Sequence, residues 1–375
     1  MQLMPSLVNF SESRGENSNL SPLFMNRLWK IPADRAHLRG WQERYNVLGN
    51  VEYSCFLHGG QEFFGSNEYQ KYVIFGRKPR KTGRIRAFQA QMVKCRNQAE
   101  LRAALASKRQ EGRSIGFVPT MGALHAGHES LVAAAKAECE TVVMSIFVNP
   151  TQFNEAKDFE SYPITLEQDL ERAEAAGADC VYLPSVDELY QGNLTVEPVD
   201  YGTLTHSFEG SMRRGHFDGV VAVVRKLFQA VEPNRAYFGE KDLQQLAVIR
   251  RLAEIEFPGL KIVGCPLVRD VDGLALSSRN VRLTGPARNR ALKLNAWIRA
   301  IQLEVESGAR ADEVLQSVRE AAQTDPEVKL EYLDLINPNT FEPWSSAMDT
   351  REAFAVVAAQ VDGVRLIDNC RVICS

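Results

Sequence analysis

Apolar and polar positions follow two different rhythms from residue 98 onward, and each rhythm indicates one kind of element. Short apolar runs bounded by turn residues predict buried strands at 114–118, 141–148, 178–183, 235–238 and 260–268. Apolar residues at helical spacing predict helices at 99–110, 127–138, 165–176, 219–231 and 242–256. Strands that alternate with helices form a parallel sheet with right-handed crossovers. The fold prediction is therefore an α/β, Rossmann-like domain over residues 92–282.

The pattern changes after residue 282. Two helices are predicted at 285–306 and 311–323, and strands follow at 329–336, 353–360 and 364–367. Helices followed by a run of strands are typical of an α+β arrangement. We therefore predict a smaller C-terminal α+β domain over residues 283–375, which serves as a lid on the first domain.

Residues 1–91 show no clear period and differ from the rest of the chain in charge. They hold 13 Lys and Arg against 7 Asp and Glu, whereas the whole chain has a net charge of −3. Basic residues gather at 77–86, and the first twenty residues lack the apolar core of a secretory signal. This extension stays unassigned. It binds nucleic acid or a targeting receptor, or is a solvated or disordered linker, or reflects a start codon placed upstream of a natural start at Met92.

The composition is that of an ordinary globular protein, with 45% hydrophobic and 24% charged residues. It excludes collagen-like, disordered and disulfide-scaffold chains, and no apolar run approaches the roughly 18 residues of a spanning helix. The near-neutral charge argues against a general nucleic-acid binder, so we expect neither a nucleic-acid partner nor a membrane. The seven cysteines form no CxxC pair, which favours reduced thiols and a cytoplasmic location.

The run PTMGALHAGH at 119–128 carries the clearest chemical signal. It lies between a predicted strand and a predicted helix, at the sheet edge where α/β proteins bind ligands. Gly122 lets backbone approach a ligand closely, and the helix start at Gly127 attracts phosphate. His125 and His128 are three residues apart, so protonated or hydrogen-bond-donating imidazoles can face one anion. A zinc site would need a third ligand from a remote part of the chain, so we predict no metal site.

Two further segments end in polar side chains that suit a pocket. FVNPTQF at 147–153 follows a predicted strand and offers the amide of Gln152 as donor and acceptor. RGHFDGV at 214–220 leads into a helix, and His216 in it either begins that helix or lines a pocket.

Another two segments offer groups that suit phosphate. In YFGEKDLQQ at 237–245, Lys241 supplies a point charge, and Asp242 either accepts hydrogen bonds from a ribose or caps the next helix. SSRN at 277–280 offers hydroxyls and a guanidinium, which suit phosphate groups. An Asp-Gly turn just before it predicts a mobile loop.

Taken together, these strings resemble the pantoate–β-alanine ligase family, within the nucleotidyltransferase superfamily whose signature is histidine–x–Gly–histidine. The resemblance covers roughly residues 92–375 and leaves out 1–91. It implies ATP-dependent condensation of pantoate with β-alanine through a pantoyl-adenylate, releasing AMP and pyrophosphate. It also implies ATP as a substrate, Mg²⁺ bound mainly through the ATP phosphates, and a homodimer.

The resemblance further implies roles for individual residues. His128, His125 and Lys241 are the expected catalytic residues, and Gln152 and Gln245 are expected to bind pantoate and β-alanine. The expected ATP-binding residues are Met121, Gly122, Ala123, Leu124, His125, Ala126, Gly127, His128, Gly239, Glu240, Lys241, Asp242, Val268, Leu276, Ser277, Ser278 and Arg279.

The sequence departs from the family at two positions near these segments. Ile164 stands where the family usually has Arg, and Arg214 stands where Pro is common. Two alternative functions remain open at this point. One is another nucleotidyltransferase, such as phosphopantetheine adenylyltransferase, and the other is a non-catalytic nucleotide- or RNA-binding protein that uses the basic extension.

Overall fold

The computed structural model describes residues 91–374 apart from 155, 346, 347 and 349, together with the backbone of three strands between residues 42 and 66. The chain divides into two compact units, residues 1–85 and 86–375. The first unit holds an antiparallel sheet of β1 (Gln42–Val47), β2 (Val51–His58) and β3 (Gln61–Ser66), in that order. The sequence pattern predicted no element here. The basic run at 77–86 lies outside the described residues.

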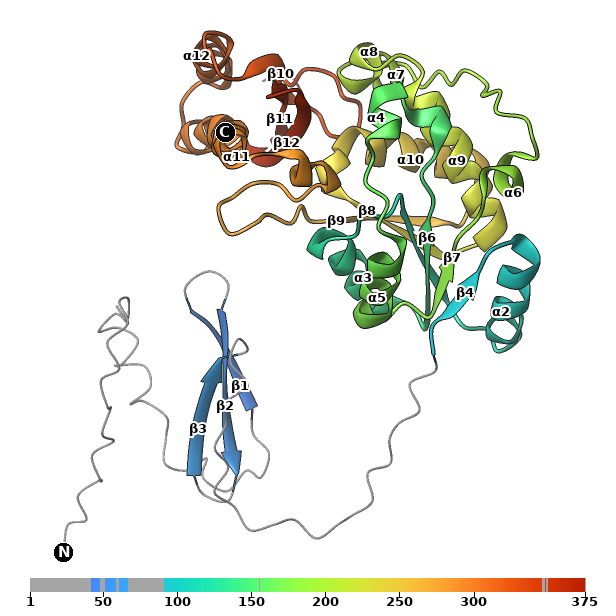
Figure 1. Ribbon diagram of the computed structural model, residues 1–375. Helices are drawn as coiled ribbons and strands as arrows, with labels where there is room; N and C mark the ends of the chain where they lie inside the picture. Colours follow the sequence, from blue (N-terminus) through green and yellow to red (C-terminus); the bar gives the residue numbers. More distant parts are fainter. Residues whose placement is uncertain are drawn as a thin grey trace, which may run out of the picture. The chain divides into compact units, whose positions relative to one another are not determined.

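A six-stranded parallel sheet forms the centre of the second unit (Figure 1). Its strand order is β4-β7-β6-β5-β8-β9. The strands are β4 (Val93–Cys95), β5 (Ile115–Thr120), β6 (Thr141–Ile146), β7 (Cys180–Tyr182), β8 (Arg235–Gly239) and β9 (Lys261–Cys265). All pairings between neighbours are parallel. The predicted α/β, Rossmann-like fold class is therefore confirmed.

Helices cover both faces of this sheet because its strands are apolar on both sides. In β5, Phe117 packs into one hydrophobic cluster, and its neighbour Val118 packs into another on the opposite face. One face holds α2 (Gln98–Gln110), α9 (His216–Val231) and α10 (Leu243–Glu256). The other face holds α3 (Ala126–Glu138) and α5 (Leu166–Ala176), as Figure 1 shows.

Four very short helices connect these elements and were not predicted. They are α4 (Ala156–Glu160), α6 (Val186–Tyr190), α7 (Thr203–His206) and α8 (Glu209–Met212). Helix α9 begins at His216, three residues before the predicted start, because Phe217 is the one large apolar side chain in its first turn and shows no period by itself. The helix predicted from Asp242 begins one residue later, after the 3-10 turn η3 (Glu240–Asp242).

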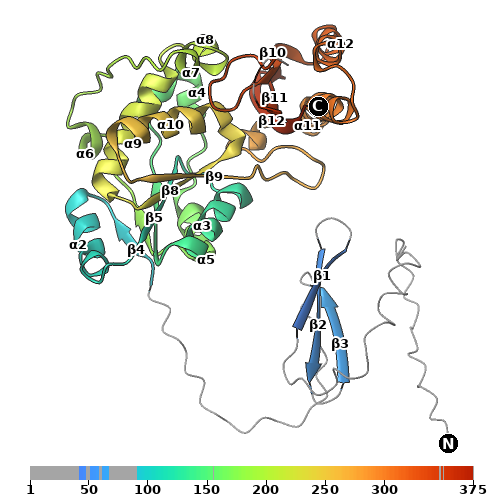
Figure 2. The same cartoon turned by 180° about the vertical axis from the view of Figure 1, so that it is seen from behind.

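A second, smaller layer follows the parallel sheet. It contains α11 (Gly285–Glu306), α12 (Ala311–Gln323) and an antiparallel sheet of β10 (Lys329–Ile336), β11 (Glu352–Val361) and β12 (Val364–Ile373) (Figure 2). These elements enclose their own hydrophobic cluster. The predicted α+β arrangement is confirmed, whereas the domain limits at 91 and 282 stay predictions. Strand β12 is six residues longer than predicted, because polar Asp368 and Asn369 interrupt its apolar pattern although both are buried.

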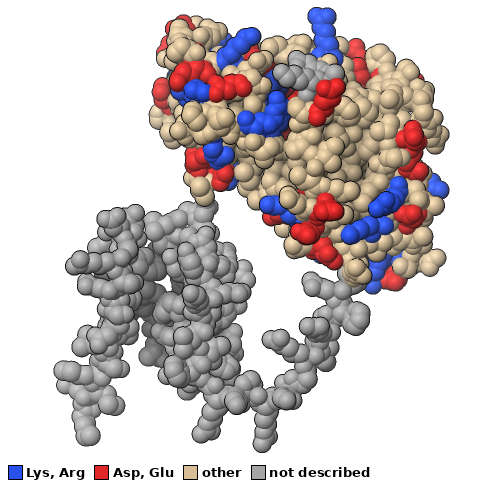
Figure 3. All heavy atoms as spheres, viewed as in Figure 1, with Lys and Arg blue, Asp and Glu red and all other residues tan. Residues whose placement is uncertain are grey.

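The surface of the described part carries both signs of charge. On the face shown in Figure 3, basic and acidic side chains gather in mixed groups. No helix in the described ranges is both long and apolar enough to cross a membrane. The six cysteines from Cys95 to Cys374 are free and buried.

Candidate active site

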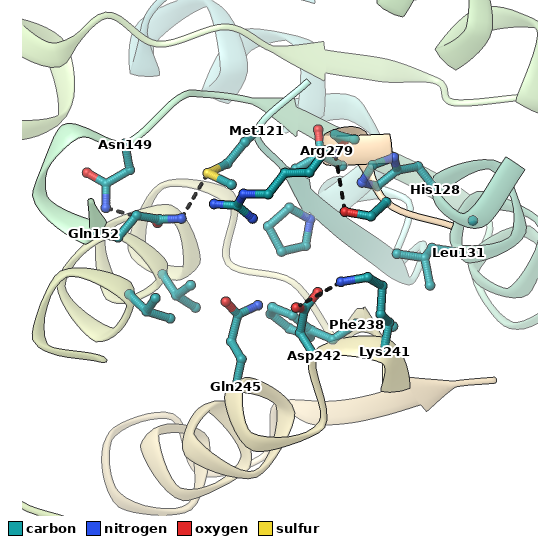
Figure 4. A pocket seen from close by; sticks show the side chains of 18 of the residues that line it. Met121, His128, Leu131, Asn149, Gln152, Phe238, Lys241, Asp242, Gln245 and Arg279 are labelled. Carbon is teal, nitrogen blue, oxygen red and sulfur yellow. Dashed lines mark hydrogen bonds and ion pairs between the residues drawn. The ribbon is translucent and has the colours of Figure 1, made fainter. Parts of the chain in front are cut away.

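A cavity of about 220 Å³ opens at the carboxyl ends of β5 and β8 (Figure 4). The chain leaves β5 toward β6 on one side and returns to β8 on the other, so the strand order reverses between β5 and β8. Such a switch point leaves a crevice in which α/β proteins bind ligands. The cavity gathers many of the residues predicted from the sequence: Met121, His125, Gly127, His128, Gln152, Gly239, Lys241, Asp242, Gln245, Val268, Leu276, Ser277, Ser278 and Arg279.

The two histidines are fixed by the start of helix α3. Nδ1 of His125 accepts a hydrogen bond from the Gly127 amide at 3.1 Å, and Nδ1 of His128 accepts one from the His125 amide at 3.3 Å. A Cβ at position 127 would lie 2.9 Å from the His125 ring, so any other residue there would displace that ring. Because each Nδ1 is an acceptor, the proton of each neutral ring resides on Nε2. The sequence of this helix start therefore selects one tautomer for both rings.

Both imidazoles are neutral at ordinary pH. Burial, and then the charge of Lys241, lowers the pKa of His125 to about 4. Burial, and then the neighbouring His125, lowers the pKa of His128 to about 3. The sequence left open whether these rings are protonated or donate as neutral groups. The geometry favours neutral rings that donate through Nε2–H.

The turn between β5 and α3 is held by a carboxylate that sequence reasoning missed. The amides of Ala123 and Leu124 donate to the two oxygens of Asp169, at 2.9 and 2.7 Å. Asp169 lies on α5 with 2% of its surface exposed. These amides are therefore already satisfied by the protein. Five of the predicted ATP-binding residues are not in the lining of the cavity: Gly122, Ala123, Leu124, Ala126 and Glu240.

Two glutamines lie in the cavity on different elements. Gln152 ends the 3-10 turn η2 (Pro150–Gln152), where its side chain accepts from Asn149 at 3.2 Å and donates to the Met121 sulfur at 2.8 Å. Gln245 comes from the first turns of α10 (Figure 4). Helix α9 approaches η2 so closely that a Cβ at Gly219 would lie 2.2 Å from the Thr151 carbonyl oxygen. That contact fixes the backbone beside Gln152.

Cationic groups come from two other loops. Nζ of Lys241 lies 3.5 Å from Oδ1 of Asp242. Asp242 makes no side-chain hydrogen bond to the start of α10, so the capping role that the sequence allowed is wrong. Ser278 donates to the Ala123 carbonyl at 3.1 Å, which ties the 3-10 turn η4 (Ser278–Arg282) to the β5 turn.

A second missed carboxylate, Asp158 on α4, holds two arginines of η4. Oδ2 accepts from Arg279 at 2.7 Å, and Oδ1 accepts from Arg282 at 3.1 Å. Burial alone would raise the pKa of Asp158, but the hydrogen bonds and charges of these arginines outweigh burial and lower it. Asp158 therefore remains a carboxylate throughout the neutral range.

The positions outside the motifs behave differently. His216 both begins α9 and lines the cavity, so its two possible roles coincide. Ile164 is 79% exposed and Arg214 is exposed, so neither departure from the family alters the lining of the cavity. Among the described residues, no group of three or more His, Cys, Asp or Glu side chains is arranged to hold a metal ion.

A profile of the pantoate-beta-alanine ligase family matches residues 93–371. The chain belongs to the pantoate–β-alanine ligase family. The protein is therefore a ligase of pantothenate synthesis, as the resemblance implied. Membership decides against the two alternatives, a different nucleotidyltransferase and a non-catalytic binding protein.

Known members of this family are similar over nearly their whole length. The pantothenate synthetase of Phocaeicola vulgatus is 46% identical over 273 residues, which cover 72% of this chain and 96% of the relative. The crystal structure of pantothenate synthetase from Thermus thermophilus is 43% identical, with a TM-score of 0.69 over 74% of this chain and 99% of that one. The pantoate-beta-alanine ligase from Francisella tularensis, complexed with beta-gamma ATP and beta-alanine, is 34% identical. Its TM-score is 0.62, and the match covers 74% of this chain and 97% of that one.

Proposed function

We propose that this enzyme condenses pantoate with β-alanine in two steps and uses ATP to activate the pantoate carboxylate. The first step forms a pantoyl-adenylate and releases pyrophosphate. The amine of β-alanine then attacks the acyl carbon and expels AMP. The observation that carries the proposal is a single cavity holding two imidazole donors, the cations Lys241 and Arg279, and two glutamines. The complex of the Francisella tularensis relative with beta-gamma ATP and beta-alanine supports it.

The catalytic residues in this proposal are His128, His125 and Lys241. Attack of a carboxylate on the α-phosphate moves negative charge onto the phosphate oxygens. Donors aimed at that charge lower the barrier, and they need no proton transfer to do so. The neutral Nε2–H groups of the two histidines suit this role, since pKa values of about 4 and about 3 make the rings poor bases that stay neutral and donate without taking up a proton.

The nucleotide is proposed to bind along the loops after β5, β8 and β9. Lys241, Ser277, Ser278 and Arg279 would hold the phosphates, and the Val268 backbone would contact adenine. Mg²⁺ would be held mainly by the phosphates and water, because the nearby carboxylates Asp158 and Asp242 already face arginines and Lys241. Its contribution would be to neutralise phosphate charge. Five of the expected ATP-binding residues do not line the cavity, and their proposed role is to shape the turns that carry the lining residues: Gly122, Ala123, Leu124, Ala126 and Glu240.

Gln152 and Gln245 are proposed to orient pantoate, and Gln152 also β-alanine. Primary amides both donate and accept, which suits a substrate that carries hydroxyl and carboxylate groups. Both side chains lie beside the histidines in the same cavity. Fixing the carboxylate and the phosphate in one orientation supplies much of the rate that positioning can give.

Isotope exchange separates the two proposed steps. Labelled pyrophosphate should enter ATP when pantoate is present, with no need for β-alanine, and AMP should accumulate in quantity only after β-alanine is added. Exchange that requires β-alanine, or pantothenate formation without exchange, would contradict the adenylate. A control without pantoate should show no exchange.

We also propose that the enzyme is a homodimer in the cytoplasm. The resemblance supports the dimer, and the free, buried cysteines suit a reducing compartment. Sedimentation equilibrium tests the dimer, and a monomer at micromolar concentration would exclude it.

A further inference from the structure

The backbone carbonyl of Gln152 is held by two side chains of another segment. It accepts a hydrogen bond from Nδ1 of His216 at 2.8 Å and a longer one from Nη2 of Arg213 at 3.4 Å. The side chain of the same residue lies in the cavity (Figure 4). The orientation of the Gln152 side chain therefore depends on the two groups that bind its backbone carbonyl, His216 and Arg213.

The tautomer of His216 follows from its other contact. Nη1 of Arg213 lies 3.1 Å from Nε2 of His216. A guanidinium only donates, so Nε2 of His216 is the acceptor. Nδ1 therefore carries the ring proton and donates a hydrogen bond to the Gln152 carbonyl. Burial, and then the charge of Arg213, lowers the pKa of His216 to about 3, so the ring keeps this form.

Arg213 is held in turn by a buried carboxylate. Oε2 of Glu209 lies 3.7 Å from Nη1 of Arg213. Glu209 is 6% exposed, and it accepts two hydrogen bonds of 2.7 Å from Arg365 and one of 2.7 Å from the Tyr332 hydroxyl. Burial alone would raise the pKa of Glu209, but the hydrogen bonds and charge of Arg365 outweigh it and lower the pKa to about 2.

These contacts form one continuous line between two parts of the fold. Tyr332 lies on β10 and Arg365 on β12, both in the C-terminal antiparallel sheet, and Glu209 lies on α8. Arg365 is further held by Glu331 at 2.8 Å. A guanidinium that two carboxylates bind in a partly buried position has little freedom to move. The line therefore runs from a rigid sheet, through Glu209 and Arg213, to the Gln152 backbone.

We infer that His216 and Arg213 are positioning residues for Gln152, and that the C-terminal sheet fixes them through Arg365 and Glu209. This inference rests on the proposed role of Gln152 in binding pantoate. The sheet thereby influences one substrate without touching it. ATP binds through other loops in the proposed function, so disturbing this line should change the use of pantoate and leave the use of ATP unaltered.

Two variants of His216 differ only in where they place a donor. The amide nitrogen of His216→Asn reaches the position of Nδ1, whereas that of His216→Gln reaches toward Nε2. We expect the asparagine to restore the pantoate KM to within about threefold of the wild-type value. We expect the glutamine to raise it about tenfold or more, since a misplacement near 1 Å costs up to about 100-fold. The ATP KM should stay unchanged in both.

A variant of the C-terminal sheet tests the rest of the line. Arg365→Gln should raise the pantoate KM about tenfold with the ATP KM unchanged. If it fails to fold, Tyr332→Phe removes only one hydrogen bond to Glu209 and should raise the same constant by a smaller factor. Arg225→Gln is the control, because it breaks a comparable double contact with Glu256, at 2.6 and 2.6 Å, on the surface.

The outcomes separate this inference from the proposed function. A wild-type enzyme that forms no pantothenate contradicts the proposed function and this inference with it. An active wild-type enzyme whose folded His216→Gln and Arg365→Gln variants keep their pantoate KM overturns this inference alone. Equal losses in His216→Asn and His216→Gln would also overturn it, because the imidazole would then act by itself.

Discussion

At the scale of single residues, backbone hydrogen bonds decide what the imidazoles at this site do. The same residue type takes opposite tautomers here: His125 and His128 accept at Nδ1, whereas His216 donates from it. Each choice follows from a neighbour that has only one hydrogen-bonding capability, either an amide N–H or a carbonyl oxygen.

Removing the imidazole of His128 should slow adenylation without unfolding the protein. His128→Ala takes away a fixed donor to the developing phosphate charge, a change that typically costs roughly 10²–10³-fold in rate. Pantoate-dependent exchange of pyrophosphate into ATP measures that rate. His206→Ala is the matched control, since His206 is on α7 and its side chain is 65% exposed. Exchange at the wild-type rate in His128→Ala would refute the role.

The buried neutral histidines also make the stability depend on pH. His125, His128 and His216 have pKa values of about 4, about 3 and about 3, against 6.5 for an ordinary histidine. The unfolded chain thus binds these protons first, so their contribution to stability is full well above pH 6.5 and is lost as the pH falls toward 3. Urea unfolding should give a lower free energy at pH 5 than at pH 7.5. An equal or higher value at pH 5 would contradict this.

The motif residues were predictable from the sequence, and their partners were not. His125, His128 and Lys241 stand next to strand ends and glycines, which is a local signal. Asp169 instead lies within an amphipathic helix, where an acid normally faces solvent. Its partners at 123 and 124 are about 45 residues away in the chain. Nothing local indicates such a contact.

At the scale of elements, the site depends on how closely short segments approach one another. The turn η2 lies against helix α9, and α4 lies against η4. The central strands β5 and β6 were predictable because each is a run of consecutive, mostly apolar residues. Helices of four or five residues, such as α4 and α8, contain too few turns to show a period.

A methyl group between α9 and η2 should displace Gln152. In Gly219→Ala the new Cβ would meet the Thr151 backbone at 2.2 Å, and backbone cannot yield as a flexible side chain does. Overpacking of this kind costs about 1–3 kcal/mol, so urea unfolding should show that loss together with a higher pantoate KM. Gly285→Ala is the control, since no atom lies within 4 Å of its new Cβ. Wild-type stability in Gly219→Ala would exclude the close approach.

Loss of the carboxylate on α4 should weaken ATP binding. In Asp158→Asn the charge that holds Arg279 and Arg282 together is gone, so the two cations repel each other. A change of about 1.4 kcal/mol corresponds to a tenfold rise in the ATP KM, which is the expected order. Asp272→Asn is the control because it removes one of the two carboxylate charges that hold Arg288, outside the cavity. A lower ATP KM in Asp158→Asn would show that Asp158 competes with phosphate, and an unchanged one would show that it has no part in ATP binding.

At the scale of the whole molecule, three hydrophobic clusters hold the described part of the second unit together. Met92 itself is 6% exposed and packs into one of them. The sequence predicted the two layers of this unit, since each has its own apolar pattern. It could not predict how the layers join, because that join rests on contacts between distant parts of the chain. They include the ion pair of Arg269 with Asp368, 99 residues apart, and the packing of Phe354 and Val356 into the first layer's core.

A chain limited to residues 92–375 should therefore fold and form pantothenate. The matched family segment begins at residue 93, and the three hydrophobic clusters formed by the described residues lie within the shorter chain. Its thermal unfolding should have the same midpoint temperature as that of the second unit in the full chain. Its kcat should lie within about twofold of the full-chain value. An insoluble or inactive fragment would show that the first unit supports the second.

The two hydrogen bonds that Asp169 accepts from the turn after β5 have a thermodynamic consequence for nucleotide binding. Amides that a protein carboxylate already satisfies do not need a nucleotide to give them shape. The binding free energy of the nucleotide is then reduced little by the ordering of backbone, which is a recognised cost of association. The turn at 123 and 124 should accordingly give the same amide exchange rates with and without nucleotide, as expected of a preformed part of the site.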